Sequence, residues 1–256
     1  MTLQPADPLA VLQTTSSRGL PRPAEERNIH SGAVELDMVL TPYQRFFRES
    51  DARSPHPSTS WKRKALADGT RHWPQAIIPF ELDAGLDAFH LKWAMDAMMQ
   101  WQLKTCIRFQ QRNLALSRKL GHSDFIRFTA GTDCKTAVGK ISGGQTVSIG
   151  SCNKGSIIHE LGHTIGYVHE QSRPDRDDNV RIIIPNIKPA NVKEFGKFSN
   201  NLVTTFGTPY DYSSIMHYSS TAFSKSDNPL LITVQTNDPH VQMVIGQRSL
   251  LTDRNL

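Results

Sequence analysis

The chain has 256 residues, a formal net charge of +5 and three cysteines. That length suffices for one large domain with an extension, because single domains usually contain about 100 to 200 residues. No apolar run approaches the roughly 18 residues of a membrane-spanning helix, so no membrane span is expected. Nucleic-acid binding is not expected either, because the excess basic residues, largely within 45–71, have no aromatic-interleaved surface or known binding motif beside them.

Residues 1–64 differ in composition from the rest of the chain. They are rich in Pro, Ser, Thr and Arg, and a stretch such as Ser54–Ser60 disfavours regular structure. We interpret the basic part of this segment as a solvated, cleavable linker. The first 30 residues lack a charged start followed by an apolar stretch of about 7 to 15 residues, so no secretory signal peptide is visible.

From Trp73 onward, the sequence has the periodicities of a folded domain. Short apolar or alternating runs predict strands, and these fall at Ile77–Leu82, Ile107–Phe109, Phe125–Phe128 and Gln145–Ile149. A long helix is expected over Leu86–Leu103, with these apolar side chains in the core: Leu86, Phe89, Trp93, Met98 and Trp101. A second helix is expected over Gly155–Tyr167.

The second helix carries the residues of a metal site. His159 and His163 lie four residues apart, so a helix with about 3.6 residues per turn projects both imidazoles toward one point. Gly166 can adopt a positive φ without a Cβ clash, which lets the helix stop and the chain turn back to bring in His169. Three protein ligands of zinc leave one coordination position for water. We therefore expect one zinc ion per chain.

Glu160 lies about 100° further round the helix than His159, so it should stand beside the metal without binding it. That is the position of a general base, which takes a proton from an activated water and passes it to a leaving amine. The alternative is a chance motif on an ordinary amphipathic helix, with its histidines satisfied by water or backbone carbonyls. Gly166 and His169 at this spacing favour the zinc site.

A second motif follows at Ser214–Tyr218, where Met216 sits in an expected turn and Tyr218 comes two residues later. Taken alone, Met216 would more often fill a gap in a core. After an extended zinc motif, such a methionine indicates the metzincin class of proteases.

Together, the two motifs resemble one metzincin family, the astacins. The resemblance extends from about Arg71 to the C-terminus and rests on these stretches: His159–His169, Glu170, Gln171–Asp178 and Tyr210–Tyr218. It implies an α+β fold, with a mixed twisted sheet and two long helices in an upper half, an irregular lower half, and an active-site cleft between them. It also implies an edge strand, expected at Gln145–Ile149, that holds an extended peptide by backbone pairing.

The resemblance implies a role for each residue of the site. The zinc ligands would be His159, His163 and His169, with Glu160 as the base. Met216 would form the hydrophobic floor beneath the metal. Tyr218 would be a displaceable zinc ligand that swings away and stabilises the oxyanion of the reaction. For Tyr218, a half-buried tyrosine at a strand end is the alternative.

The segment Val34–Leu40 resembles the family's propeptide signature, in which an aspartate reaches the zinc and blocks it. Asp37 is therefore the candidate ligand of a latent form, residues 1–64 the propeptide and residues 65–256 the catalytic domain. Cleavage within Lys62–Lys64 by an activating, trypsin-like protease would release an enzyme that begins near Ala65. The new terminal amine would be buried and paired with Glu170, for which a surface carboxylate is the alternative.

By the same resemblance, Cys134 and Cys152 match a disulfide of the family. Cys106 matches another family cysteine, whose partner would follow Leu256, so Cys106 is either paired in a longer chain or a free, buried thiol. Disulfides indicate an oxidising compartment. Because the family is mostly secreted, we expect an extracellular protein, although no signal peptide is visible.

The sequence thus predicts a zinc endopeptidase of the astacin type that is made as a latent precursor and cleaves proteins or peptides. A different metzincin is disfavoured by Glu170 and by the spacing from Met216 to Tyr218. A zinc-bound but inactive peptide-binding module is the alternative from another class of protein. The intact Glu160 argues against it.

Overall fold

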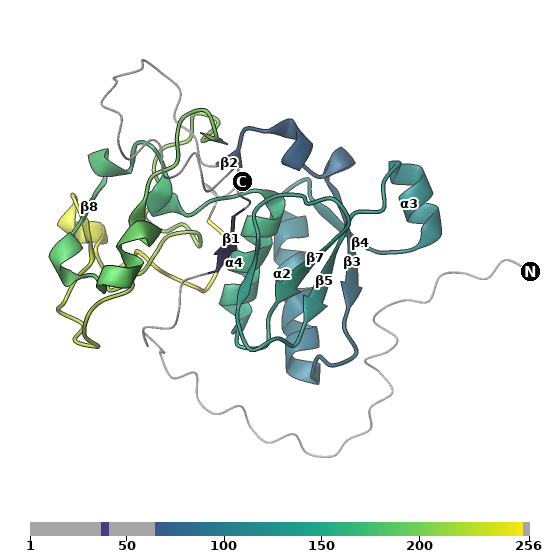
Figure 1. Ribbon diagram of the computed structural model, residues 1–256, viewed down its shortest axis with the longest axis horizontal. Helices are drawn as coiled ribbons and strands as arrows, with labels where there is room; N and C mark the ends of the chain where they lie inside the picture. Colours follow the sequence, from purple (N-terminus) through teal and green to yellow (C-terminus); the bar gives the residue numbers. More distant parts are fainter. Residues whose placement is uncertain (1–36, 41–64, 253–256) are drawn as a thin grey trace, which may run out of the picture. The chain divides into compact units, whose positions relative to one another are not determined.

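The computed structural model describes residues 37–40 and 65–252 (Figure 1). All of them belong to one compact unit, Gly32–Leu256. The predicted processing site at Lys62–Lys64 lies outside the described residues, as does most of the predicted propeptide.

A six-stranded sheet organises the first part of the unit. In the order in which they lie side by side, the strands are β1 (Met38–Val39), β6 (Lys135–Ala137), β7 (Gly144–Ser148), β5 (Phe125–Thr129), β3 (Ile77–Leu82) and β4 (Arg108–Gln111). Neighbouring strands run parallel, except that β6 and β7 are antiparallel. The sheet is therefore mixed, as the resemblance implied.

The edge strand was predicted wrongly. The strand expected at Gln145–Ile149 is β7, which lies between β5 and β6 inside the sheet. At this end of the sheet the outermost strand from residues 65–252 is β6, and β1 covers it with Met38 opposite Thr136 and Val39 opposite Ala137, while β4 forms the other edge. Because β6 has only three residues, its sequence shows no alternation from which a strand could be predicted.

Two long helices lie side by side next to the sheet (Figure 1). Helix α2 (Ala88–Lys104) begins after Asp87, and α4 (Lys154–Ile165) begins after Asn153; each of these capping side chains accepts an N–H of the first turn. A short helix, α3 (Leu114–Leu120), joins β4 to β5. None of the described helices is long and apolar enough to cross a bilayer.

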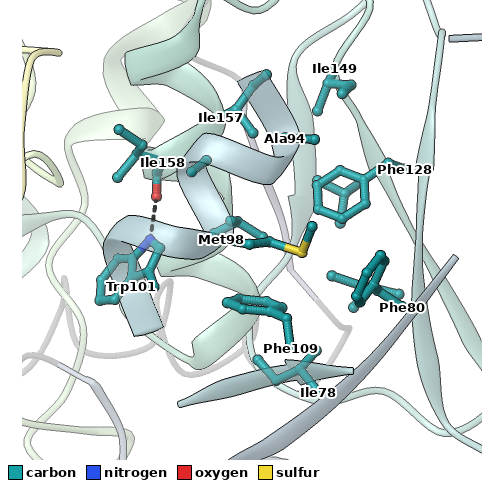
Figure 2. Packing of buried hydrophobic residues seen from close by; sticks show 14 of the residues in the cluster. Ile78, Phe80, Ala94, Met98, Trp101, Phe109, Phe128, Ile149, Ile157 and Ile158 are labelled. Carbon is teal, nitrogen blue, oxygen red and sulfur yellow. Dashed lines mark hydrogen bonds between the residues drawn. The ribbon is translucent and has the colours of Figure 1, made fainter. Parts of the chain in front are cut away.

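The sheet and the long helices share one apolar core, shown in Figure 2. Trp101 of α2 is fully buried, and its indole N–H donates to the carbonyl oxygen of Ile158 on α4 at 2.9 Å. Three of the five core residues predicted around α2 are buried as expected: Leu86, Met98 and Trp101. Phe89 is not, since 48% of it is exposed. The small side chains Ala94 and Ala97 of this helix are fully buried instead.

The part of the chain after α4 has little regular structure. It consists mainly of 3-10 turns: η5 (Glu170–Ser172), η6 (Arg176–Asp178), η7 (Ile184–Asn186), η8 (Pro189–Phe195) and η9 (Pro239–Val241). Two further 3-10 turns, η3 (Gly69–Arg71) and η4 (Pro74–Ala76), precede β3. Short antiparallel pairs add the remaining strands: β8 (Val180–Ile182) with β10 (Val234–Thr236), and β2 (Ala65–Leu66) with β9 (Val203–Thr204). The expectation of an irregular lower half thus matches this region.

Candidate metal centre

Helix α4 presents two of the predicted ligands with their ring orientations fixed. The Nδ1 atom of His159 lies 2.7 Å from the carbonyl oxygen of Ile215, and that of His163 lies 2.8 Å from the carbonyl oxygen of Tyr167. A carbonyl oxygen can only accept, so each Nδ1 carries the proton and each Nε2 offers a lone pair. Hydrogen bonds of this kind orient histidines that bind metals.

The third histidine is brought back by the turn predicted at Gly166. This residue has φ +124°, and its N–H donates to the carbonyl oxygens of Gly162 and His163, which ends the helix. Three residues further on, His169 is fully buried. Its Nε2 atom lies 3.3 Å from Nε2 of His159.

Asp37 completes the cluster from the other end of the chain. Its Oδ2 lies 2.9 Å from Nε2 of His159, and its Oδ1 lies 3.0 Å from Nε2 of His169 and 3.7 Å from Nε2 of His163. The backbone of the segment is held by the N–H of Thr136, which donates to the carbonyl oxygen of Asp37 at 3.0 Å. Four ligand atoms, all within 4.8 Å of one another, therefore converge in a buried place.

These four residues fit a zinc ion. Burial lowers the pKa of His159 to about 4 and that of His169 to about 3, so both rings are neutral at neutral pH. Burial opposes ionisation of Asp37, but the positive charge that His169 and His159 carry when protonated outweighs it and lowers the pKa of the carboxyl. Within the described residues, Oδ1 of Asp37 and Nε2 of His163 lack a hydrogen-bond partner. An ionised carboxylate facing lone pairs needs a cation between them.

The spacing of the ligand atoms agrees with this conclusion. Tetrahedral ligands about 2.1 Å from a zinc ion stand about 3.4 Å from one another. The four separations given above run from 2.9 to 3.7 Å. With Asp37 in place, all four positions around such an ion would be filled by protein.

Glu160 lies beside the cluster and does not belong to it, as its helical position predicted. It is 1% exposed, and one of its carboxyl oxygens, Oε1, lies 3.7 Å from the sulfur of Cys134. Burial raises the pKa of Glu160 well above its usual value, and the charge of Asp37 raises it further. Both effects disfavour the ionised form of the carboxyl group.

The cysteines are arranged only partly as expected. Cys134 and Cys152 form the disulfide that the resemblance implied. Cys106 has no disulfide partner among the described residues, and it is exposed, so the alternative of a free, buried thiol was wrong. The residue lies just after α2, where the chain leaves the core.

The second motif lies directly against the metal helix. Met216 is fully buried, and a Cβ added to Gly162 would lie 2.5 Å from its sulfur, so Met216 packs under the helix between the two histidines. Tyr218 is 1% exposed, and its ring centroid lies 4.4 Å from that of His169. Tyr218 is thus fully buried beside a predicted ligand, which does not fit the alternative of a half-buried tyrosine at a strand end.

Glu170 belongs to a buried polar network. Its Oε1 accepts from the guanidinium of Arg173 at 2.8 Å and from the backbone N–H of Asp211 at 3.0 Å. Glu170 and Arg173 are both fully buried, so the alternative of a surface carboxylate for Glu170 does not hold. Arg173 also pairs with Asp175 through two hydrogen bonds of 2.9 Å.

Sequence reasoning gave no role to three residues that organise this region. Arg173 anchors the network around Glu170. The side-chain oxygen of Gln171 accepts the backbone N–H of Tyr218 at 3.0 Å. Nδ1 of His217 lies 2.7 Å from the carbonyl oxygen of Tyr218, and its Nε2 lies 2.7 Å from the hydroxyl of Tyr210. The only available signal was their position inside the stretches that resemble the family.

A helix with two histidines and a glutamate, a glycine turn to a third histidine and a methionine beneath them define the class of zinc metalloproteases known as metzincins. Within that class, residues 65–256 match the peptidase family model described as Astacin. The chain therefore belongs to the astacin family, whose members are zinc metalloproteases, as the sequence predicted.

Individual relatives agree with this assignment. Blastula protease 10 of Paracentrotus lividus is 37% identical over 224 residues, which cover 86% of this chain and 36% of that protein. Zinc metalloproteinase nas-36 of Brugia malayi is 39% identical over 196 residues, which cover 76% of this chain and 32% of that protein. The chain thus spans about a third of the length of these curated relatives.

A solved structure confirms the α+β fold. High choriolytic enzyme 1, a hatching enzyme zinc-protease from Oryzias latipes, superimposes with a TM-score of 0.65 at 32% identity. The similarity covers 78% of this chain and 94% of that one.

Proposed function

We propose that this chain is a zinc-dependent endopeptidase, with His159, His163 and His169 as the metal ligands. The observation that carries the proposal is the convergence of these three rings beside the buried carboxyl group of Glu160. When bound, zinc would supply a Lewis acid that activates water and polarises a peptide carbonyl. Proteins or peptides would be the substrates.

The surrounding side chains would handle the protons and the developing charge. Glu160 would take a proton from the attacking water and deliver it to the leaving amine. Tyr218, packed on His169, would donate its hydroxyl proton in a hydrogen bond to the oxyanion. Met216 would support the metal helix from below through its contact at Gly162.

We further propose that the described arrangement is a latent form and that residues 1–64 are its propeptide. Asp37 would act in two ways. With zinc bound, it would fill the place where water must bind, because three histidines and one carboxylate would complete four-coordination of the ion. Its negative charge beside Glu160 also raises the pKa of that group, which disfavours the ionised form that a general base needs. Release of Asp37 would remove both effects.

Processing within Lys62–Lys64 by an activating protease would release Asp37. Ala65, the first residue of the proposed mature enzyme, pairs with Tyr167 and with Thr204. Its new amine would then extend the network around Glu170. The disulfide between Cys134 and Cys152 supports the proposal of an extracellular location.

The test is a peptidase assay on the zinc-loaded full-length chain with casein and a fluorogenic peptide. Wild type, Glu160→Ala and Asp37→Ala are compared, each with and without trypsin and each with and without a chelator. We expect activity from wild type only after trypsin, loss of that activity with chelator, and about a 10³-fold or larger loss for Glu160→Ala at unchanged zinc content. Asp37→Ala should be partly active without trypsin.

Two results would contradict the proposal. Activity that is indifferent to chelator would overturn the metal mechanism. An Asp37→Ala precursor that stays fully inactive until it is cleaved would overturn the role of Asp37. A processed wild type that binds zinc and peptides but cuts none would instead support the inactive peptide-binding module.

A further inference from the structure

Next to the metal cluster lies a separate group of buried apolar side chains, here called the junction cluster: Leu66, Val138, Val168, Phe198, Leu202 and Val203. Each is at most 5% exposed. They come from β2, from the residue after β6, from the residue before His169, and from β9 and the segment that leads into it. The junction cluster therefore joins the outer strand of the sheet to the irregular region directly beside the third histidine.

Two side chains of the N-terminal segment cover the junction cluster. Met38 and Leu40 are half-buried and pack against it, whereas Val39 between them is 45% exposed. In a strand, alternate residues share a face. A single short strand thus places Asp37 in the metal cluster and, one and three residues later, two apolar side chains on the junction cluster.

The backbone of the same strand is held in a way that any extended peptide can copy. Met38 lies opposite Thr136 and Val39 opposite Ala137 on β6. Continuing this register places Leu40 opposite Val138, a member of the junction cluster. Peptides that add a strand to a sheet gain affinity from backbone pairing and specificity from alternate side chains.

We infer that, once the N-terminal segment is removed, the surface left by Met38 and Leu40 on the junction cluster is a subsite for an apolar side chain of the peptide substrate. Removal of the segment exposes the apolar side chains of the cluster to water, and an apolar substrate residue covers them again. Asp37 lies at the metal cluster, where the scissile bond of a substrate would lie. Because Met38 and Leu40 follow Asp37 by one and three residues, the subsite should accept a residue one or three positions from the scissile bond, on one side of it. This inference rests on the proposed peptidase function.

The first test is the cleavage of a randomised peptide library by the zinc-loaded full-length chain after trypsin treatment. We expect Met, Leu, Ile or Phe to be enriched about fivefold or more over Ser and Asp, at the first or third position on one side of the cut. A flat profile within three residues on both sides, or a preference for charged residues there, would overturn the inference.

A variant of the junction cluster tests whether the cluster binds substrate or only supports the fold. Val138→Thr nearly keeps the shape of the side chain and replaces one methyl group by a hydroxyl. For a substrate with Leu at the preferred position, kcat/KM should fall about fivefold, while for the same substrate with Ala it should stay within about twofold. Equal losses on both substrates would show a structural defect and overturn the inference.

A binding measurement keeps this inference separate from the proposed catalysis. A labelled synthetic peptide with the sequence of residues 33–41 is titrated against trypsin-treated, zinc-loaded Glu160→Ala protein, and its anisotropy is recorded. Changing Met38 and Leu40 to Ser in the peptide should weaken binding about tenfold or more. Changing Val39 to Ser, the matched control, should alter binding less than about twofold.

The two arms have distinct outcomes. Equal weakening by the double change and by the Val39 control would overturn the subsite whether or not any peptide is cut. The expected binding pattern without cleavage of any library peptide would support the subsite and reject the peptidase function.

Discussion

The regions before and after Val168 satisfy their backbone polar groups and fill their interiors in different ways. Before it, a sheet and two helices satisfy the backbone through regular ladders, and the core between them is apolar. After it, short turns and two-stranded pairs leave fewer ladder bonds, and buried side chains such as Arg173 and Glu170 bond to each other and to the backbone. The metal cluster takes His159 and His163 from the first region and His169 from the second.

This difference shows how the site depends on two kinds of order. Helix periodicity alone sets the spacing of the two histidines on α4. No such regularity places Met216 and Tyr218, whose backbone is fixed by individual contacts to Glu170, Gln171 and His217. We therefore expect changes in buried polar groups to be most costly in the second region.

The largest effect is expected for Arg173→Met. The change leaves Glu170 and Asp175 without their guanidinium partner, so the free energy of unfolding should fall by about 3–5 kcal/mol. Urea denaturation of the zinc-loaded chain at pH 7 measures it. Arg181→Met, at an exposed arginine whose side chain bonds to Gln235, is the control and should cost about 0–1 kcal/mol. Similar losses for the two variants would show that the second region does not depend on its buried charges.

Acid should destabilise the second region through His217. Burial lowers the pKa of this residue to about 4, against about 6.5 in an unfolded chain. Between these values the unfolded chain binds a proton that the folded chain does not, so stability falls as pH drops through that window. The contribution should reach about 3 kcal/mol at pH 4.

Urea denaturation at pH 7, 6, 5 and 4 checks this expectation. His217→Gln should lose less stability than wild type across the series. The exposed His240→Gln is the control and should follow wild type. Parallel curves for wild type and His217→Gln would contradict the expectation.

A smaller, purely functional effect is expected for Tyr218→Phe. The loss of the hydroxyl removes one donor to the oxyanion, so kcat should fall about 10²-fold while zinc content and melting temperature stay unchanged. Tyr212→Phe, whose hydroxyl donates to the backbone of Asn179, is the control and should keep its turnover. Unchanged turnover of Tyr218→Phe would contradict the proposed catalytic role of the Tyr218 hydroxyl.

The smallest effect is expected for Gly162→Ala, where the two regions touch. The new Cβ would lie 2.5 Å from the sulfur of Met216 and 3.3 Å from Trp101, which forces Met216 to move. Overpacking costs about 1–3 kcal/mol, and alanine returns about 1 kcal/mol of helix propensity, so the net loss should be about 1 kcal/mol. Gly69→Ala, with no atom within 4 Å of its Cβ, is the control. A stabilised Gly162→Ala would mean that Met216 is loosely packed.

Elements with a strong period could be predicted from the sequence. Strand β3 was predicted with its observed bounds, Ile77–Leu82, and the metal helix to within two residues at each end. The short strand β6 was missed because three residues cannot show alternation. Phe89 was predicted to lie in the core because helical periodicity alone does not tell which face packs against the neighbouring helix. That face can carry large side chains or small ones.

The candidate site divides in the same way. The three histidines and Glu160 follow from spacing within eleven residues. Asp37 comes from a resemblance alone, since 122 residues separate it from His159. The bonds of Arg173 to Thr208 and Pro209 join residues 35 and 36 positions apart, and no local pattern announces such contacts.

The strand β1 holds Asp37 through only two residue pairs. So short a pairing would gain from the covalent tether between Leu40 and Ala65, which holds it at an effective concentration on the order of millimolar. Cutting the tether removes none of these contacts. It would turn the proposed intramolecular inhibitor into a separate molecule at the far lower concentration of the enzyme itself. Activation would then be driven by dilution of the cleaved N-terminal segment. The further this segment diffuses from the enzyme, the more slowly the inhibition would return.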